Sequence, residues 1–172
     1  MTYGTNKRDA IVELVKSVNS SVSDGQGGHL KLCDGIGMQS YIGGYGQQSG
    51  CMNDNDITAV KNAIEKFASI GVEVHVTELA VRNYERSDER EAEHGAFYKK
   101  LMQTYVDINK EAKAKGETGP ITSLSIWGLF DAPYLAETDY SYKMNGPYCG
   151  LFTELYQPKE AFKEVYKVLS GE

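Results

Sequence analysis

The sequence has 172 residues, 41% of them hydrophobic, which is enough to bury the core of one domain or of part of a larger one. Eighteen basic residues against twenty-four acidic ones give a formal net charge of −6. This balance argues against nucleic acid or an anionic membrane surface as the main partner and favours a neutral substrate. The sequence has no apolar run of about 18 residues, the length needed to span a bilayer, and its first residues lack the pattern of a signal peptide.

The expected elements alternate between helices and short strands. Apolar residues at helical spacing, with Leu14 on the apolar face of the first segment, predict helices over residues 7–20, 56–70, 87–115 and from about 158 onward, and Ser87 is expected to cap the third. Short β-rich runs predict strands over 30–40, 72–79 and 121–127, and a long tyrosine-rich loop is expected over 130–157. Strands that alternate with helices in this way predict βα units and a parallel sheet, whose functional side chains follow the carboxyl ends of the strands.

Glu78 lies near the end of the apolar run 72–79, where a parallel barrel strand would present a carboxylate to an active site. The alternative for any such Glu is a solvated strand-end charge. Gln39 and Tyr41 follow the preceding strand and Trp127 ends the next one. An amide, a phenol and an indole around a carboxylate suit a sugar, because its hydroxyls need donors and acceptors while its apolar face stacks on a ring.

A doubly wound sheet is the competing architecture. Such a fold usually carries a phosphate-binding loop, and Gly35-Ile36-Gly37 lacks both the third glycine of a dinucleotide fingerprint and the lysine of a P-loop.

Three segments carry a resemblance that covers essentially the whole chain. The motifs DGIGMQSY (34–41), VTEL (76–79) and SIWGLFDAP (125–133), in this order and spacing, resemble the C-terminal half of glycoside hydrolase family ten endo-1,4-β-xylanases. The resemblance implies the C-terminal part of a (β/α)8 barrel, from about strand five or six to strand eight, with no cofactor and no metal. It implies that Glu78 is the retaining nucleophile, that Gln39 contacts the sugar near the scissile bond, and that Trp127 forms a wall of the same subsite.

The chain departs from the family pattern at three positions. Tyr41 replaces the usual His that hydrogen-bonds the nucleophile, which predicts similar geometry with a different pH dependence. Ser141-Tyr142-Lys143 holds the place of a Ser-Trp pair, so Tyr142 and Lys143 are assigned to substrate binding with a smaller stacking surface. Ala80 stands where the family has Asp, which removes a polar neighbour of the nucleophile.

The second carboxyl group of a retaining glycosidase is not recognisable. In the family this acid/base Glu follows the fourth strand, and residues 1–172 match only the later strands. Glu85, Glu89 and Glu137 lack the neighbouring Asn of that motif, and we expect them to be solvated charges. Three strands and part of a fourth cannot close a barrel, so two edges and an apolar interior would be exposed. The expected partner is the N-terminal half of the barrel, encoded with this segment or separately; a second copy is the least favoured alternative.

The remaining histidines and cysteines are expected to be structural. We predict that His75 packs under a helix and that His29 and His94 lie at the surface. Three cysteines are an odd number without CxxC spacing, which predicts neither a disulfide framework nor a zinc site. Cys33 is expected to be buried, and a bridge between Cys51 and Cys149 remains a hypothesis because both follow strands at one barrel face.

The sequence thus predicts the nucleophile-bearing half of a retaining endo-1,4-β-xylanase that acts on xylan. Two alternatives stay open: a catalytically silent carbohydrate-binding or assembly fragment, and a barrel glycosidase of another specificity, such as a cellulase. Polymeric xylan cannot enter a cell, so a secreted enzyme is expected.

Overall fold

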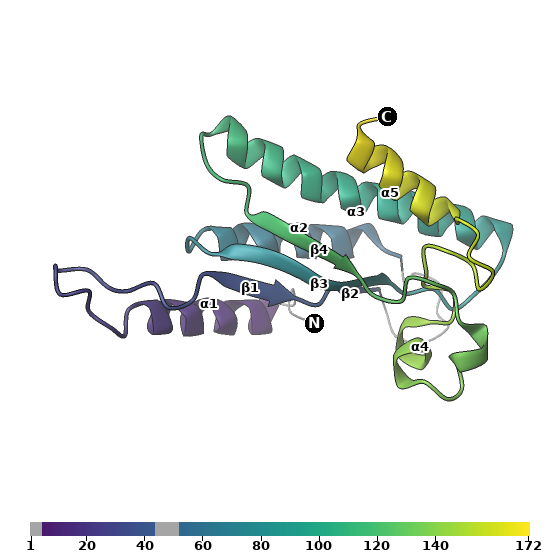
Figure 1. The fold of residues 1–172 in the computed structure, drawn as a ribbon, viewed down its shortest axis with the longest axis horizontal. Coiled ribbons are helices and arrows are strands. Elements are labelled where there is room, and N and C mark those ends of the chain that lie inside the picture. The colour runs from purple at the N-terminus through teal and green to yellow at the C-terminus, as the bar shows by residue number, and fades with distance from the viewer. Residues whose placement is uncertain (1–4, 44–51) are drawn as a thin grey trace.

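The computed structural model describes residues 5–43 and 52–172, which form one parallel sheet covered by helices (Figure 1). The strands are β1 (Gly35–Met38), β2 (Tyr41–Ile42), β3 (Glu73–Val81) and β4 (Ile121–Ile126). The helices are α1 (Thr5–Asn19), α2 (Asp54–Ala68), α3 (Asp88–Ala114), α4 (Tyr140–Asn145) and α5 (Glu160–Ser170), with a short 3₁₀ turn at Pro133–Leu135. None of these helices combines the length and the apolar character needed to cross a membrane, over the part of the chain that the structure describes.

The sheet is centred on β3, which pairs in parallel with β1, β2 and β4. Because a strand has two edges, β1 and β2 follow one another along the same edge of β3, and β4 occupies the other. Gln39 and Ser40 separate β1 from β2, and Ser40 has a φ of 65°, in the left-handed region that few non-glycine residues adopt. Among the described residues β1 and β4 have no second strand partner, so the sheet is open. The predicted α/β class and incomplete barrel are confirmed.

Local sequence explains where helices α2 and α3 begin. The side chain of Asn53 accepts a hydrogen bond from the Asn55 amide at the start of α2, and Ser87 accepts one from the Arg90 amide at the start of α3. Acidic residues fill the first turn of both helices, where the helix dipole favours them. The predicted Ser87 cap is therefore confirmed, and Gly71, with a φ of 76°, follows the end of α2.

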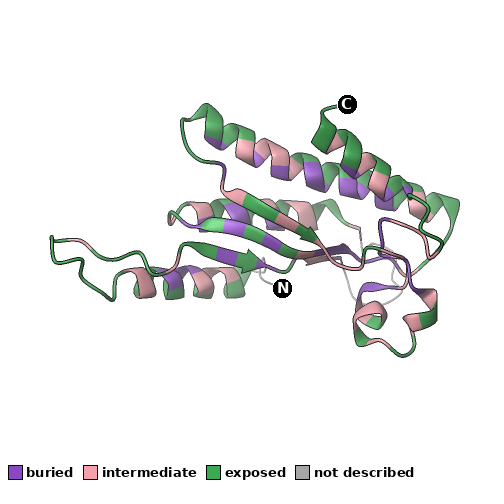
Figure 2. Ribbon diagram, in the orientation of Figure 1, coloured by how far each residue is buried: buried purple, intermediate pink, exposed green. Residues whose placement is uncertain are grey.

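The helices cover one face of the sheet and leave the other open (Figure 2). Val74 and Val76 of β3 are fully buried on the helix side, together with Met38 of β1. The residues that alternate with them are exposed: Gly35, Gly37, Gln39, Glu73, His75, Thr77, Ser123 and Ser125. This open face, which would line the barrel, is small and polar. The expectation of an apolar exposed interior was therefore wrong, because the apolar side chains of the strands point outward beneath α2 and α3.

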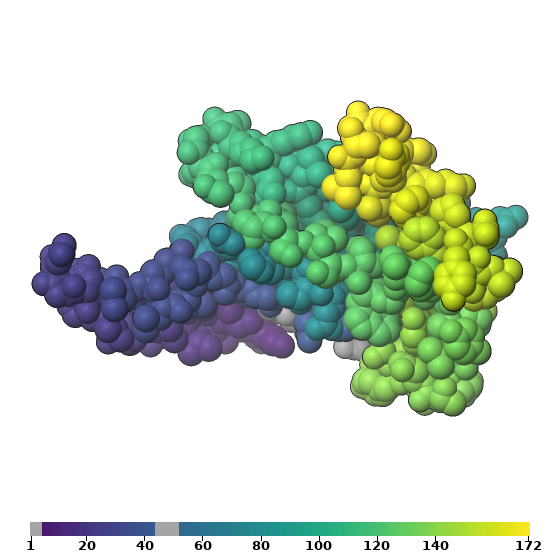
Figure 3. Space-filling view, in the orientation of Figure 1, coloured from purple at the N-terminus to yellow at the C-terminus, as the bar shows by residue number. Residues whose placement is uncertain are grey.

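Three expected elements have different bounds or contents. The strand predicted from residue 30 begins at Gly35. Residues 20–32 before it form a loop that protrudes from the molecule, in which the Leu30 amide bonds to the Val22 carbonyl at 2.9 Å (Figure 3). The long loop 130–157 contains α4 and the 3₁₀ turn. Helix α1 buries Val12 and Val15, while Leu14, predicted on its apolar face, is 63% exposed.

The histidine predictions were largely wrong. His75 has a half-exposed side chain that lies 3.3 Å from Glu73 Oε2 on the open face, because alternation along β3 points it away from the helices. His94 is completely buried in α3, whereas His29 is exposed as expected. Cys33 is only partly buried; Cys149 is buried with a free thiol, and Cys51 lies outside the described residues, so the bridge hypothesis does too.

Candidate active site

The candidate site lies at the carboxyl ends of β2, β3 and β4. Glu78 sits near the end of β3 where the strand carries one extra residue relative to β4, since Val76 pairs with Leu124 but Leu79 pairs with Ile126. Such a bulge changes the direction of a side chain. Glu78 is partly exposed while Thr77 before it is exposed and Leu79 after it is fully buried. The irregularity thus keeps the carboxylate available on the open side of the sheet.

Tyr41 is the direct partner of Glu78. The first residue of β2 donates a short hydrogen bond from its hydroxyl to Glu78 Oε2. The backbones around the pair are joined as well, because the Glu78 amide bonds to the Gln39 carbonyl at 3.1 Å and the Ala80 amide to the Ser40 carbonyl at 3.2 Å. Burial and the neighbouring carboxylate raise the pKa of the Tyr41 hydroxyl well above its usual value of 10. Tyr41 therefore remains a proton donor at any working pH.

Three aromatic rings form a row of contacts that begins at the partner of the carboxylate, Tyr41. The Trp127 ring lies edge-on to Tyr41 with centroids 6.0 Å apart, and it is tilted against Tyr142 at 5.3 Å. Trp127 follows β4 and its amide bonds to the Leu79 carbonyl at 2.9 Å, whereas Tyr142 comes from α4. Asp139 holds the start of α4 by accepting hydrogen bonds from the Ser141 and Tyr142 amides. We call Tyr41, Trp127 and Tyr142 the aromatic row.

Two predicted substrate-binding residues are less constrained. The Gln39 side chain is exposed on the open face, next to the Glu78 backbone, in a position to contact a ligand there. Lys143 lies on α4 beside Tyr142 with an exposed side chain that makes no hydrogen bond or ion pair to residues 5–43 or 52–172. The structure therefore links Glu78 to Tyr41, Tyr41 to Trp127 and Trp127 to Tyr142, and it leaves the role of Lys143 a prediction.

The other carboxylates considered above are solvated, as expected. Glu85, Glu89 and Glu137 are all exposed, and Glu85 lies 3.8 Å from Arg90. In the described part of the chain no group of three His, Cys, Asp or Glu side chains is arranged to hold a metal ion. The arrangement around Glu78 thus offers one carboxylate with a phenol donor and an aromatic surface.

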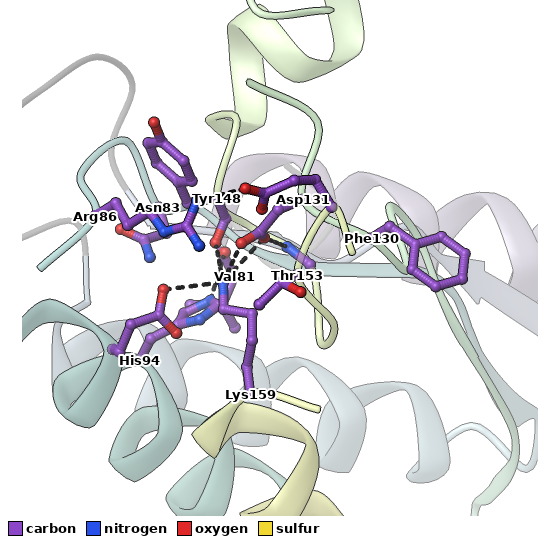
Figure 4. A network of polar contacts seen from close by, with 12 residues as sticks. Val81, Asn83, Arg86, His94, Phe130, Asp131, Tyr148, Thr153 and Lys159 are labelled. Carbon is purple, nitrogen blue, oxygen red and sulfur yellow. Dashed lines mark hydrogen bonds and ion pairs between the residues drawn. The ribbon is translucent and has the colours of Figure 1, made fainter. Parts of the chain in front are cut away.

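A buried ion network supports the loop that follows Trp127 (Figure 4). Lys159, which precedes α5, donates to both carboxylate oxygens of Asp131 at 2.9 Å and to the Tyr148 carbonyl at 2.9 Å. Its Nζ also lies 3.1 Å from Glu91 Oε1 on α3. Burial raises the pKa of Asp131 to about 6, while the positive charge of Lys159 acts in the opposite direction. The network ties the exit of β4 to α3 and α5.

Sequence reasoning assigned no role to Asp131 or Lys159. Asp131 stands inside the third motif, and this position within a motif was the available signal. Lys159 gave none, because it is 28 residues away from its partner and isolated lysines are usually solvated. The short parallel strands, the outer helices and the clustered strand ends are typical of a segment of a β/α barrel.

Comparison with known proteins identifies the family. The family model described as "Glycosyl hydrolase family 10" matches residues 1–168, so the chain belongs to glycosyl hydrolase family 10. Endo-1,4-beta-xylanase B of Butyrivibrio fibrisolvens is 32% identical over 142 residues, which are 80% of this chain and 19% of the relative. Exoglucanase XynX of Acetivibrio thermocellus is 32% identical over 157 residues, 91% of this chain and 11% of the relative.

A solved structure gives the same result in three dimensions. The CBM22-1-GH10 modules of the Clostridium thermocellum endo-1,4-beta-D-xylanase 10B, complexed with xylohexaose, match with a TM-score of 0.65 and 27% identity, over 95% of this chain and 27% of that one. The chain therefore spans between 11% and 27% of the length of these three proteins, and it corresponds to a C-terminal part of the barrel.

Proposed function

We propose that this chain supplies the nucleophile half of a retaining endo-1,4-β-xylanase. The observation that carries the proposal is the pairing of Glu78 with the Tyr41 hydroxyl, beside the ring of Trp127 and at the carboxyl end of a barrel strand. Membership in family 10 and the xylanase names of its relatives support xylan as the substrate. The N-terminal half of the barrel is the proposed partner, and an extracellular location follows from the size of the polymer.

In this mechanism Glu78 attacks the anomeric carbon of the sugar. The glycosidic C–O bond breaks, its electron pair passes to the leaving oxygen, and an acid/base carboxyl group outside this chain protonates that oxygen. The same group then removes a proton from water, which displaces Glu78 from the glycosyl-enzyme intermediate. Retaining enzymes place the two carboxyl groups about 5 to 5.5 Å apart. Tyr41 holds the attacking oxygen, and Gln39 and Trp127 contact the sugar.

The test uses this chain mixed with a separately produced N-terminal half. We expect reducing-sugar release from xylan by the mixture, and we expect Glu78→Gln to lower the rate on the order of 10⁴-fold or more, because the nucleophile is lost. Glu85→Gln, which alters an exposed carboxylate seven residues further along the chain, in the loop after β3, is the matched control and should retain activity. A fluorinated xyloside that traps the intermediate should label the Glu78 peptide. A folded mixture without hydrolysis would reject the proposal.

A catalytically silent sugar-binding fragment is the second candidate. It is favoured by the single carboxylate among the described residues of the site, since Glu85, Glu89 and Glu137 point into solvent. Xylo-oligosaccharide binding by the chain alone, with no hydrolysis in any mixture, would support it. A third candidate, a cellulase specificity, is suggested by the exoglucanase name of one relative. Rates on cellohexaose and xylohexaose, compared in the same mixture, separate these specificities.

A further inference from the structure

Arg82 is one of the largest fully buried side chains of the molecule. It follows β3, four residues after Glu78, and is 2% exposed. Its amide bonds to the Ile42 carbonyl at 3.0 Å, so its backbone continues the pairing of β3 with β2. A buried guanidinium is costly unless its donors are bonded, and the groups that it bonds therefore indicate what it stabilises.

The guanidinium donates to the backbone of two other segments of the site. Nε donates to the Met144 carbonyl at 3.1 Å, and Nη1 makes a short hydrogen bond to the Gly43 carbonyl. Gly43 comes two residues after Tyr41, and Met144 comes two residues after Tyr142. A positive charge at the last turn of α4 is also favoured by the helix dipole. Arg82 thus bridges the two segments that carry the outer rings of the aromatic row.

Neither of these segments is rigid by its own local structure. Strand β2 has two residues and α4 has six, both below the length at which such elements are stable alone. Trp127 lies between their rings, 6.0 Å from Tyr41 and 5.3 Å from Tyr142. A planar group with several fixed donors sets the spacing between two carbonyls in a way that a flexible lysine ammonium does not.

We propose that Arg82 is a positioning residue that sets the spacing of Tyr41 and Tyr142 on either side of Trp127. In terms of the proposed function, on which this role in sugar binding rests, it shapes the subsite next to the nucleophile without touching the substrate. The loop itself has further support, because the Asn83 amide bonds to the Asn145 carbonyl at 3.0 Å and the Tyr148 amide to the Asn83 carbonyl at 3.2 Å. Loss of the guanidinium should therefore leave the fold intact and alter the aromatic row.

The single tryptophan of the chain makes this testable. Chain labelled with 5-fluorotryptophan gives one ¹⁹F resonance, from Trp127, even when an unlabelled N-terminal half is added. We expect Arg82→Met and Arg82→Lys to shift or broaden this resonance. Titration with xylohexaose, followed by the shift of the same resonance, should give a Kd that is raised by roughly tenfold, or about 1.4 kcal/mol. Far-UV circular dichroism should stay unchanged.

Two control variants separate positioning from general damage. Arg86→Met removes an Arg of the same loop whose guanidinium pairs with Glu154 at 2.7 Å, away from the aromatic row, and Ile64→Ala makes a cavity in the core under α2. Neither should move the Trp127 resonance. An unchanged resonance in both Arg82 variants would overturn the proposal. The proposal would also be overturned if both Arg82 variants failed to fold under conditions in which Ile64→Ala folds, since Arg82 would then stabilise the whole fold. A shifted resonance with no response to xylohexaose even in the parent would reject the sugar-binding function and retain the positioning role.

Discussion

Tyr41 is the residue whose chemistry differs most from the family pattern that the motifs resemble. A histidine at this place would exchange a proton near neutral pH, whereas burial and Glu78 raise the pKa of Tyr41 above its usual value. The phenol therefore donates to the Glu78 carboxylate over the whole working range. Charge-assisted hydrogen bonds of this kind are stronger than neutral ones.

We expect Tyr41→Phe to lower kcat/KM by roughly 10- to 100-fold, because a hydrogen bond to a charged group contributes about 1.5 to 3 kcal/mol. The measurement is hydrolysis of an aryl xylobioside by the chain mixed with the N-terminal half. Tyr41→His should restore part of the rate and add a pH dependence near 6.5, where imidazole titrates.

The comparison variant for Tyr41 is Tyr140→Phe. Tyr140 is 74% exposed at the start of α4, so its hydroxyl is solvated and its loss should change the rate little. Equal rates for Tyr41→Phe and the parent would show that the hydroxyl bond does not assist Glu78.

Helix α3 carries a buried imidazole beneath the end of β3. His94 Nε2 lies 3.1 Å from the Val81 carbonyl, and because a carbonyl can only accept, this nitrogen carries the proton. The ring lies edge-on to Tyr98 at 5.1 Å, and Nδ1 has no hydrogen-bond partner within the described segments. Burial lowers the pKa of His94 to about 3, and the positive charge of Lys159 acts in the same direction. The folded chain thus holds a neutral histidine against the strand that bears Glu78.

Acid should destabilise the chain through His94. Between about pH 6.5 and pH 3 the unfolded chain binds a proton that the folded chain does not, so the free energy of unfolding falls as the pH falls. Proton linkage to this one group changes the free energy of unfolding by up to about 1.4 kcal/mol per pH unit. Urea unfolding at a series of pH values measures it, and His94→Gln, which keeps a donor for the Val81 carbonyl, should flatten the dependence.

His29→Gln provides the matched substitution at an exposed histidine, and it should leave the pH dependence as in the parent. Parallel stability curves for His94→Gln and the parent would contradict a neutral buried His94.

The elements show which features local pattern could predict. Alternation in β3, the Ser87 cap of α3 and the motif around Trp127 depend on neighbouring residues, and these predictions were confirmed in position. His94 and Lys159 depend on distant partners, and local pattern favours the surface for both residue types. The side on which His75 lies depends on which face the helices cover, and an open sheet leaves the barrel side exposed.

At the scale of the molecule, the described residues form an open sheet with two free edges and a polar inner face. Within the described ranges β1 and β4 bond only to β3, so the backbone groups on their outer edges have no strand partner. Glu73, His75 and Thr122 form a hydrogen-bonded cluster on the inner face, with Thr122 Oγ1 2.9 Å from Glu73 Oε2. In the barrels of solved relatives these edges belong to a closed sheet, which explains why the proposed partner is the other half of a barrel.

Hydrogen exchange should show where that partner binds. When the N-terminal half is added, the amides of β1 and β4 that do not bond to β3 should exchange more slowly by roughly tenfold or more, since each gains a hydrogen bond worth about 1 to 1.5 kcal/mol. Amides of β3, which are already paired on both edges, should change little and serve as the internal reference. An unrelated protein at the same concentration should have no effect. A contrary result is also possible to recognise: both edges become protected as the concentration of this chain alone increases, and the mass in solution doubles. That result would show that a second copy closes the sheet, and it would reject the N-terminal half as the required partner.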